Sequence, residues 1–173
     1  VLGTVRQAIT DTDADGMDDA WETTNFGSLS QTASGDFDSD GMTNLEEYTH
    51  GFTPTVADGF ADADGDRYPN VFEVRAGSNP NSAASLPTPT YTVNAAGGGT
   101  HTTIAGAISS ATTTNGQYQI IGIAPGTYTG TSNAQNLTIA STKPTLLIIG
   151  LEGAGKTIID GAQEIARCMA GVA

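Results

Sequence analysis

Cysteine, basic residues and long apolar runs are scarce in this chain, and each shortage excludes a class of protein. The 173 residues include one cysteine, Cys168, so no internal disulfide framework can form. Six basic residues stand against 19 acidic ones, and the formal net charge of −13 argues against nucleic acid or an anionic membrane surface as a partner. No apolar run approaches the roughly 18 residues of a membrane span. Because the chain begins with Val1 rather than methionine, we interpret it as a processed or excised piece.

The charge is concentrated in the first half of the chain. Residues 1–80 hold 16 acidic and 3 basic residues, whereas residues 81–173 hold 3 of each. A stretch rich in Pro, Ser and Ala lies between the halves, which is typical of a linker. The sequence therefore predicts a boundary near residue 85 and four segments: an extended N-terminus (1–10), an acidic domain (11–82), a linker (83–90) and a neutral domain (91–173).

The acidic domain repeats one pattern of oxygen-bearing residues three times. The repeats begin at Asp11, Asp36 and Asp62, so successive offsets are 25 and 26 residues. Oxygen donors occupy positions 1, 3, 5, 9 and 12 of each repeat, which is the spacing of a calcium loop whose position 7 adds a backbone carbonyl. The predicted ligands are Asp11, Asp13, Asp15, Met17, Asp19 and Glu22; Asp36, Asp38, Asp40, Met42, Asn44 and Glu47; and Asp62, Asp64, Asp66, Tyr68, Asn70 and Glu73.

These loops need a cation, because four or five carboxylates packed closely together oppose one another's ionisation. We therefore expect up to three Ca²⁺ ions to be part of the fold. The third loop departs from the pattern at position 6, where Arg67 replaces the glycine found at Gly16 and Gly41. That position lies in a sharp turn that favours a residue tolerant of positive φ, so Arg67 is expected to strain the turn and to add a positive charge.

The repeats resemble the bacterial thrombospondin type 3-like calcium repeats of secreted surface proteins. The resemblance covers roughly residues 9–82 and rests on the Asp-x-Asp-x-Asp-Gly-x-x-Asp/Asn-x-x-Glu cores and on two Gly-x-x-Pro tails. It implies a rigid, calcium-dependent spacer rather than a signalling sensor. Short helices are expected after the loops, at 18–25, 43–50 and 69–76, with their apolar side chains forming a small core between repeats.

The neutral domain contains one helical pattern followed by several β-prone runs. Ile104, Ala107, Ile108 and Ala111 have helical spacing and predict a short helix within residues 102–111. Turn residues separate the β-prone runs, which predicts strands rather than one long element. The predicted strands are 118–123, 126–129, 137–140, 145–149 and 156–159.

The neutral domain resembles the beginning of a right-handed parallel β-helix of the pectate-lyase-like type. The resemblance rests on residues 91–94 before the short helix, on residues 121–128 and on residues 156–161. It implies two or three rungs, so the expected fold is mostly β with short helices: tandem EF-hand-like calcium loops joined to a short right-handed parallel β-helix. The family's lyase chemistry uses clustered Asp, Arg and Lys, which this domain lacks, so no catalytic residue carries over.

Four shorter motifs are interpreted as structural. Gly150–Thr157 satisfies the P-loop pattern, but β-branched residues and a glycine follow it, so we expect a turn between rungs and no nucleotide. His50 and His101 are far apart in sequence, which favours surface or turn positions over a metal pair or a catalytic base. Cys168 is expected to be a buried thiol. Asn136-Leu-Thr138 matches a glycosylation acceptor pattern.

The leading hypothesis is a non-enzymatic, secreted calcium-binding structural module of a bacterial extracellular or cell-surface protein. The alternative is an N-terminal fragment of a carbohydrate-active β-helix enzyme, similar to polysaccharide lyases. A surface polysaccharide or glycan and a second copy of the chain are the partners considered. Residues 1–9 are apolar and β-prone, so they are a candidate added strand for a neighbour, which would build an extracellular fibre. A monomeric stalk segment stands beside the fibre as an equal alternative.

Overall fold

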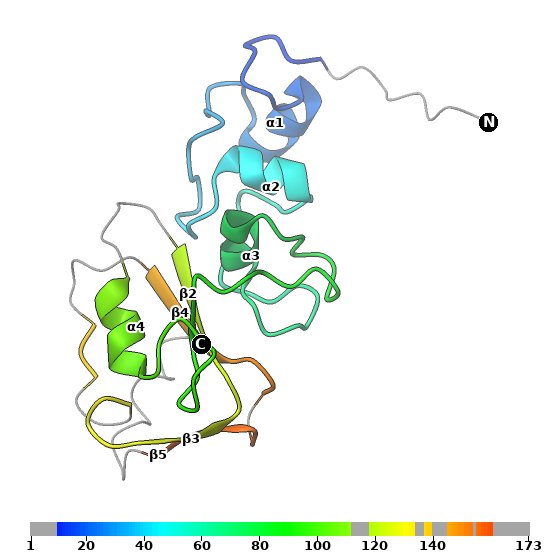
Figure 1. The fold of residues 1–173 in the computed structure, drawn as a ribbon. Coiled ribbons are helices and arrows are strands. Elements are labelled where there is room, and N and C mark those ends of the chain that lie inside the picture. Colours follow the sequence, from blue (N-terminus) through cyan, green and yellow to red (C-terminus); the bar gives the residue numbers. More distant parts are fainter. Residues whose placement is uncertain (1–9, 112–117, 134–136, 140–144, 154, 161–173) are drawn as a thin grey trace. The chain divides into compact units, whose positions relative to one another are not determined.

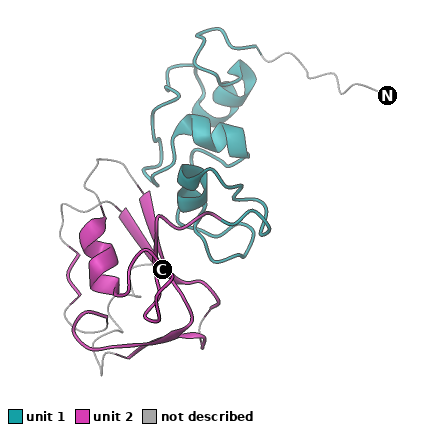
Figure 2. Cartoon of the chain, in the orientation of Figure 1, with its two compact units in different colours: residues 1–86 teal, residues 87–173 magenta. Residues whose placement is uncertain are grey.

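A computed structural model describes residues 10–111, 118–133, 137–139, 145–153 and 155–160. The chain divides into two compact units, residues 1–86 and 87–173, beside the change in composition near residue 85 (Figure 2). The predictions made for residues 1–9, Asn136 and Cys168 lie outside the described residues. Within the described part, no helix is both long enough and apolar enough to cross a membrane.

Unit 1 contains three short helices, each of which follows an acidic loop (Figure 1). They are α1 (Asp19–Phe26), α2 (Asn44–His50) and α3 (Asn70–Ala76), and the predicted spans are confirmed to within one residue at each end. The side chain of Asp18 caps α1, and Thr43 forms a capping box with Glu46 at α2. All three helices end at a glycine with positive φ, at Gly27, Gly51 and Gly77.

The apolar side chains of the three repeats form the small core that the sequence predicts. Met17 and Met42 at position 7 of their loops are 0% exposed, and Tyr68 occupies the third equivalent position with 5% exposure. Aromatic rings join the first two repeats, because Trp21 lies 5.1 Å from Tyr48 between ring centroids, in an edge-to-face arrangement.

Unit 2 contains parallel strands in two sheets and one helix. The elements are β1 (Tyr91–Val93), α4 (Ile104–Ser110), β2 (Tyr118–Ile123), β3 (Gly126–Thr129), β4 (Thr145–Gly150) and β5 (Thr157–Asp160). The first sheet has the order β1-β2-β4, and the second pairs β3 with β5. Every pair is parallel, and the passage from the first sheet to the second in β2 and β3 is repeated in β4 and β5 (Figure 1). The buried cluster of this unit consists of Val93, Ile104, Ala107, Ile108, Ile121, Ile123 and Tyr128.

The mostly β character of unit 2 is confirmed, but the described strands form open sheets rather than a closed β-helix. The strand predicted at 137–140 is wrong over its described residues 137–139, which are not in a strand. Leu137 packs against the core, whereas Ile139 is 47% exposed. Only one of these side chains is held by packing, and β propensity alone does not form a strand. The strand predicted at 156–159 is shifted by one residue.

The P-loop-like segment and His101 of unit 2 make contacts that support the fold. Thr157 begins β5, where a phosphate-binding loop would need the first turn of a helix. The Lys156 carbonyl accepts a hydrogen bond from the Gly126 N–H at 2.8 Å, which joins the loop to the neighbouring strand. His101 forms hydrogen bonds through both ring nitrogens, at 3.0 Å to the Thr100 hydroxyl and at 2.8 Å to the Ser110 hydroxyl.

Candidate metal centres

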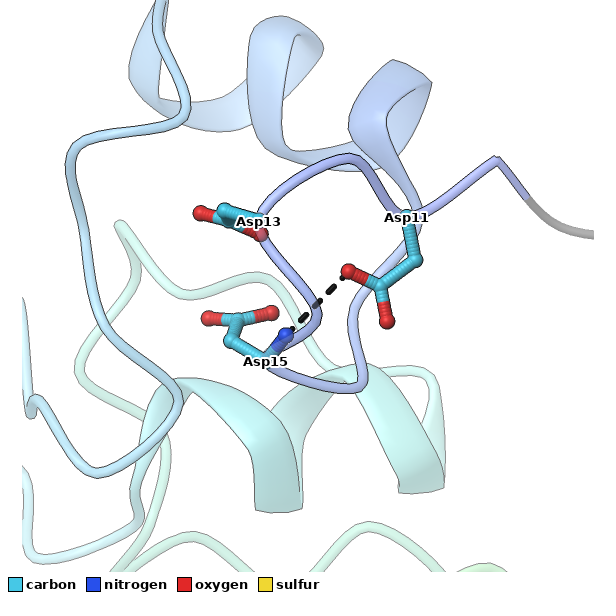
Figure 3. A group of neighbouring side chains, drawn as sticks. All are labelled: Asp11, Asp13 and Asp15. Carbon is cyan, nitrogen blue, oxygen red and sulfur yellow. Dashed lines mark hydrogen bonds between the residues drawn. The ribbon is translucent and has the colours of Figure 1, made fainter.

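The three acidic loops share one backbone geometry. In the first loop, the Asp11 carboxylate accepts the N–H groups of Asp15 and Gly16, at 3.2 and 3.0 Å. The first aspartates of the other two loops accept the corresponding N–H groups at 2.7–3.2 Å. These bonds turn the chain back on itself, and Figure 3 shows Asp11, Asp13 and Asp15 arranged around that turn. Each loop therefore brings its alternate carboxylates to one place.

The aspartates at positions 1, 3 and 5 form a tight group in every loop. One carboxylate oxygen from each residue lies within 4.8 Å of the other two, which is close enough for a shared cation. The turn requires positive φ at position 4, with values of 62°, 65° and 82°, and at position 6, with values of 98°, 96° and 84°. The first two loops place glycine at position 6, and the third places Arg67 there, as the sequence indicated.

The glutamates at position 12 are buried, and most of their carboxylate oxygens lack a hydrogen-bond partner among the described residues. Glu22, Glu47 and Glu73 are each 0% exposed. Both carboxylate oxygens of Glu22 and Glu47, and one oxygen of Glu73, have no hydrogen-bond partner. A buried ionised carboxylate without a partner is strongly unfavourable, and buried polar atoms in native proteins are nearly always paired. These oxygens have the surroundings of metal ligands.

The electrostatics of the glutamates follow from this burial. Burial, followed by the charges of Asp38 and Asp40, raises the pKa of Glu47 to about 8. Burial, followed by Asp66 and Asp64, raises the pKa of Glu73 to about 7. The pKa of Glu22 is raised by the same two causes, burial first. In the absence of a cation, the fold therefore favours the protonated glutamates.

The backbone N–H of position 7 bonds to the loop, and its side chain is buried. The N–H groups of Met17, Met42 and Tyr68 each donate to the position-5 aspartate, at 2.8–3.0 Å. This bond uses one oxygen of the position-5 carboxylate and leaves the second oxygen to other partners, and the position-7 carbonyl stays a predicted ligand. In the first and third loops, that second oxygen, on Asp15 and Asp66, is buried without a partner.

Position 9 makes hydrogen bonds within its repeat, and its side chains stay predicted ligands, because an oxygen that accepts one hydrogen bond keeps a second lone pair. The Asn44 amide oxygen accepts the Phe37 N–H at 3.2 Å, and its nitrogen donates to the Thr32 carbonyl at 2.9 Å. Asn70 makes the same two bonds one repeat later. Asp19 accepts from the backbone and hydroxyl of the position-2 threonine, which lowers its pKa. The side chain at position 9 therefore joins the loop to its helix through these hydrogen bonds.

One acidic residue outside the repeat pattern joins the second loop. Asp58 lies four residues before the third loop, and its carboxylate groups with those of Asp40 and Glu47 within 4.8 Å. Its Oδ1 atom is buried and has no hydrogen-bond partner. The repeat alignment does not select Asp58, because Thr32 occupies the equivalent place one repeat earlier. The only sequence signal is the presence of a further acidic residue between two loops.

The positive φ of Arg67 predicts that glycine at this position stabilises the protein. A non-glycine residue in this conformation costs roughly 1–2 kcal/mol, and the greater freedom of glycine in the unfolded chain offsets about half of that. We expect Arg67→Gly to raise the free energy of unfolding by about 0.5–1 kcal/mol in saturating calcium, measured by thermal unfolding. Arg67→Lys keeps both the strain and the charge and is the matched control. A glycine variant less stable than the lysine variant would contradict the assignment of strain.

The groups of metal-ligating side chains found among the described residues all lie in unit 1, between Asp11 and Asp66. They are built from oxygen donors alone, and each is closed by a buried glutamate or adjoins one. In comparisons with known proteins, no family model, no curated protein and no solved structure matches the chain.

Proposed function

We propose that residues 11–82 are a calcium-binding structural module of a secreted or cell-surface bacterial protein. The observation that carries this proposal is the burial of Glu22, Glu47 and Glu73 with carboxylate oxygens that no protein group satisfies. Each of these glutamates adjoins a loop whose three aspartates already lie within 4.8 Å of one another. A divalent cation in each loop would neutralise the aspartates and complete the coordination with the glutamate.

Calcium is the ion that suits these donors best. The loops offer carboxylates and backbone carbonyls but no histidine or cysteine, and hard oxygen donors favour Ca²⁺, Mg²⁺ or Mn²⁺ over Zn²⁺. Mg²⁺ requires near-ideal octahedral geometry and retains several waters, whereas Ca²⁺ accepts six to eight oxygens in irregular shells. A loop that offers three aspartates, one carbonyl and one buried glutamate suits the irregular oxygen shell of Ca²⁺.

The module would act as a spacer, because its metal sites alternate with contacts between repeats. Arg75 of α3 pairs with Glu46 of α2 at 2.6 Å and donates to the Gly41 carbonyl of the second loop at 2.9 Å. Filling the second loop would therefore stiffen the part of the chain against which α3 rests. Extracellular modules bind calcium with dissociation constants of about 10⁻⁴–10⁻³ M, so millimolar calcium outside a cell would fill roughly half or more of such sites.

For unit 2 we propose the first rungs of a right-handed parallel β-helix, with a structural rather than catalytic role. The support is the repeated order of strands, since β2 and β3 are followed by β4 and β5 in the same two sheets. The described residues of this unit contain no acidic group comparable to those of unit 1, so nothing on this surface favours the polysaccharide-lyase alternative. Self-association through residues 1–9, which would build a fibre, and binding to a surface glycan belong to the same proposal.

The direct test is the number and identity of the bound ions. The full chain would be dialysed against 1 mM CaCl₂, and its calcium content would be measured by elemental analysis, with parallel dialysis against MgCl₂ as the control. We expect up to three Ca²⁺ ions per chain and little Mg²⁺, because the irregular carboxylate loops suit the larger ion. A chain that retains no calcium, or that takes up Mg²⁺ equally, would refute the proposed function.

A further inference from the structure

The connection into the third loop differs from the connection into the second. In both repeats, two N–H groups at the start of the helix donate to carbonyls that precede the first aspartate of the loop, at 2.8–3.1 Å. The alignment defined by these bonds places Ala33 opposite Gly59 and Thr32 opposite Asp58. The position-9 amides confirm it, because one donates to the Thr32 carbonyl and the other to the Asp58 carbonyl, both at 2.9 Å.

Gly59 allows this connection to touch the second loop. Its N–H donates to Oδ2 of Asp40, and a Cβ atom at this position would lie 2.7 Å from the Asp40 carbonyl oxygen, closer than side chains tolerate. Ala33, the equivalent residue in the second repeat, carries a Cβ, so an approach of this kind is closed to it. The glycine therefore brings the neighbouring Asp58 carboxylate against the loop of the preceding repeat.

The carboxylates that meet there leave buried oxygens without partners. Glu47 is 0% exposed and both of its oxygens are unpartnered, as is the buried Oδ1 atom of Asp58. Asp40 supplies both of its oxygens to backbone N–H groups, so it offers no proton to either neighbour. Three carboxylates within 4.8 Å of one another, two of them with unsatisfied buried oxygens, form a candidate cation site.

No corresponding carboxylate serves the other two loops. Thr32 stands at the aligned position one repeat earlier, and Ala84 stands 26 residues after Asp58. The second loop therefore has five candidate carboxylates, whereas the first and third have four each once position 9 is set aside. The five are Asp36, Asp38, Asp40, Glu47 and Asp58.

We propose that Asp58, in the connection between α2 and the third loop, is a metal ligand of the second loop, so that Ca²⁺ at this loop ties that connection to it. The inference rests on the proposed calcium-binding function, and the ion is the same Ca²⁺. The repeat pattern alone does not predict this additional carboxylate ligand at the second site. The ion at this site would have ligands from the second loop, from α2 and from the connection between α2 and α3, so its loss would release Asp58 from the second loop.

Asp58→Ala in the full chain tests the proposal, because it removes the carboxylate and keeps the backbone carbonyl that accepts from Asn70 and Ala61. We expect calorimetric calcium titration to show one site weakened roughly tenfold or more relative to the parent, because affinity in such loops follows the number of charged ligands. Hydrogen exchange at the Gly59 N–H should become faster in calcium. Glu152→Ala removes one exposed charge from unit 2 and is the matched control.

Asp58→Asn, which keeps the size of the side chain, is the second variant, and far-UV circular dichroism in calcium verifies that both variants fold. A weakened site in both variants with the control unchanged supports the proposal. Titrations of both Asp58 variants that overlay the Glu152→Ala control would overturn it while leaving the proposed function intact. A parent chain that binds no calcium would instead remove the proposed function and this inference together.

Discussion

Removing calcium is expected to lower the melting temperature of the protein by more than about 10 °C. At a calcium concentration 100 times the dissociation constant, a single site contributes about 2.7 kcal/mol to the free energy of unfolding. For a unit of this size, each kcal/mol corresponds to about 4–8 °C. The measurement compares thermal unfolding in 10 mM CaCl₂ with unfolding in excess chelator. Equal melting temperatures at neutral pH would exclude a structural metal.

The same comparison of melting temperatures, repeated at several pH values, tests whether calcium takes the place of protons on the glutamates. The pKa of Glu47 is raised from 4.5 to about 8 and that of Glu73 to about 7, so the metal-free fold favours their protonated forms. That contribution to stability is fully present below pH 4.5 and is lost as the pH rises through 7 and 8. Calcium replaces the protons, so the loaded chain should not show this loss. The difference in melting temperature between the calcium-loaded chain and the metal-free chain should therefore widen from pH 5 to pH 8.

Glu47→Gln is expected to have opposite effects in calcium and in chelator. In calcium the variant loses a charged ligand of the second site, and about 2.7 kcal/mol of stabilisation disappears if that site empties at 100 times its dissociation constant. In chelator at pH 8, a neutral amide of similar size replaces a buried carboxylate with no partner, so the free energy of unfolding should rise.

Chemical denaturation in both conditions measures this reversal. Glu152→Gln is the matched control, because it changes the same functional group on the exposed surface of unit 2 and should leave both values unchanged within about 0.5 kcal/mol. A Glu47→Gln variant that is destabilised equally in calcium and in chelator would show that Glu47 supports the fold without a metal.

Local spacing was sufficient to predict the loops and their helices. The position-1 carboxylate closes its own loop through bonds that span four or five residues, so the geometry depends on neighbours that the sequence displays. The same holds for the strain at Arg67, which follows from the turn alone. Helix ends were predictable because a glycine follows each of them.

Contacts between segments could not be read from the spacing. The spacing does not show that the Asn44 amide nitrogen donates to the Thr32 carbonyl, twelve residues away. The Asp58 carboxylate lies beside that of Asp40, eighteen residues upstream, because of the glycine that follows it, and no repeat of the pattern marks such an approach. The strand predicted at 137–140 fails for a related reason, since a strand depends on a neighbouring ladder as well as on β propensity.

The hydrogen bonds of position 9 also bear on how this chain gains or loses length in evolution. The bonds that Asn44 and Asn70 make join each helix to its own loop and to the connection just before that loop, so a unit cut ahead of Thr32 or Asp58 would carry these bonds with it. A duplication or deletion at the junction of the first and second repeats would leave these bonds intact. The junction of the second and third repeats is the exception, because a unit inserted there would separate Asp58 from Asp40 and Glu47. We therefore expect duplications and deletions to be rarer at the junction of the second and third repeats.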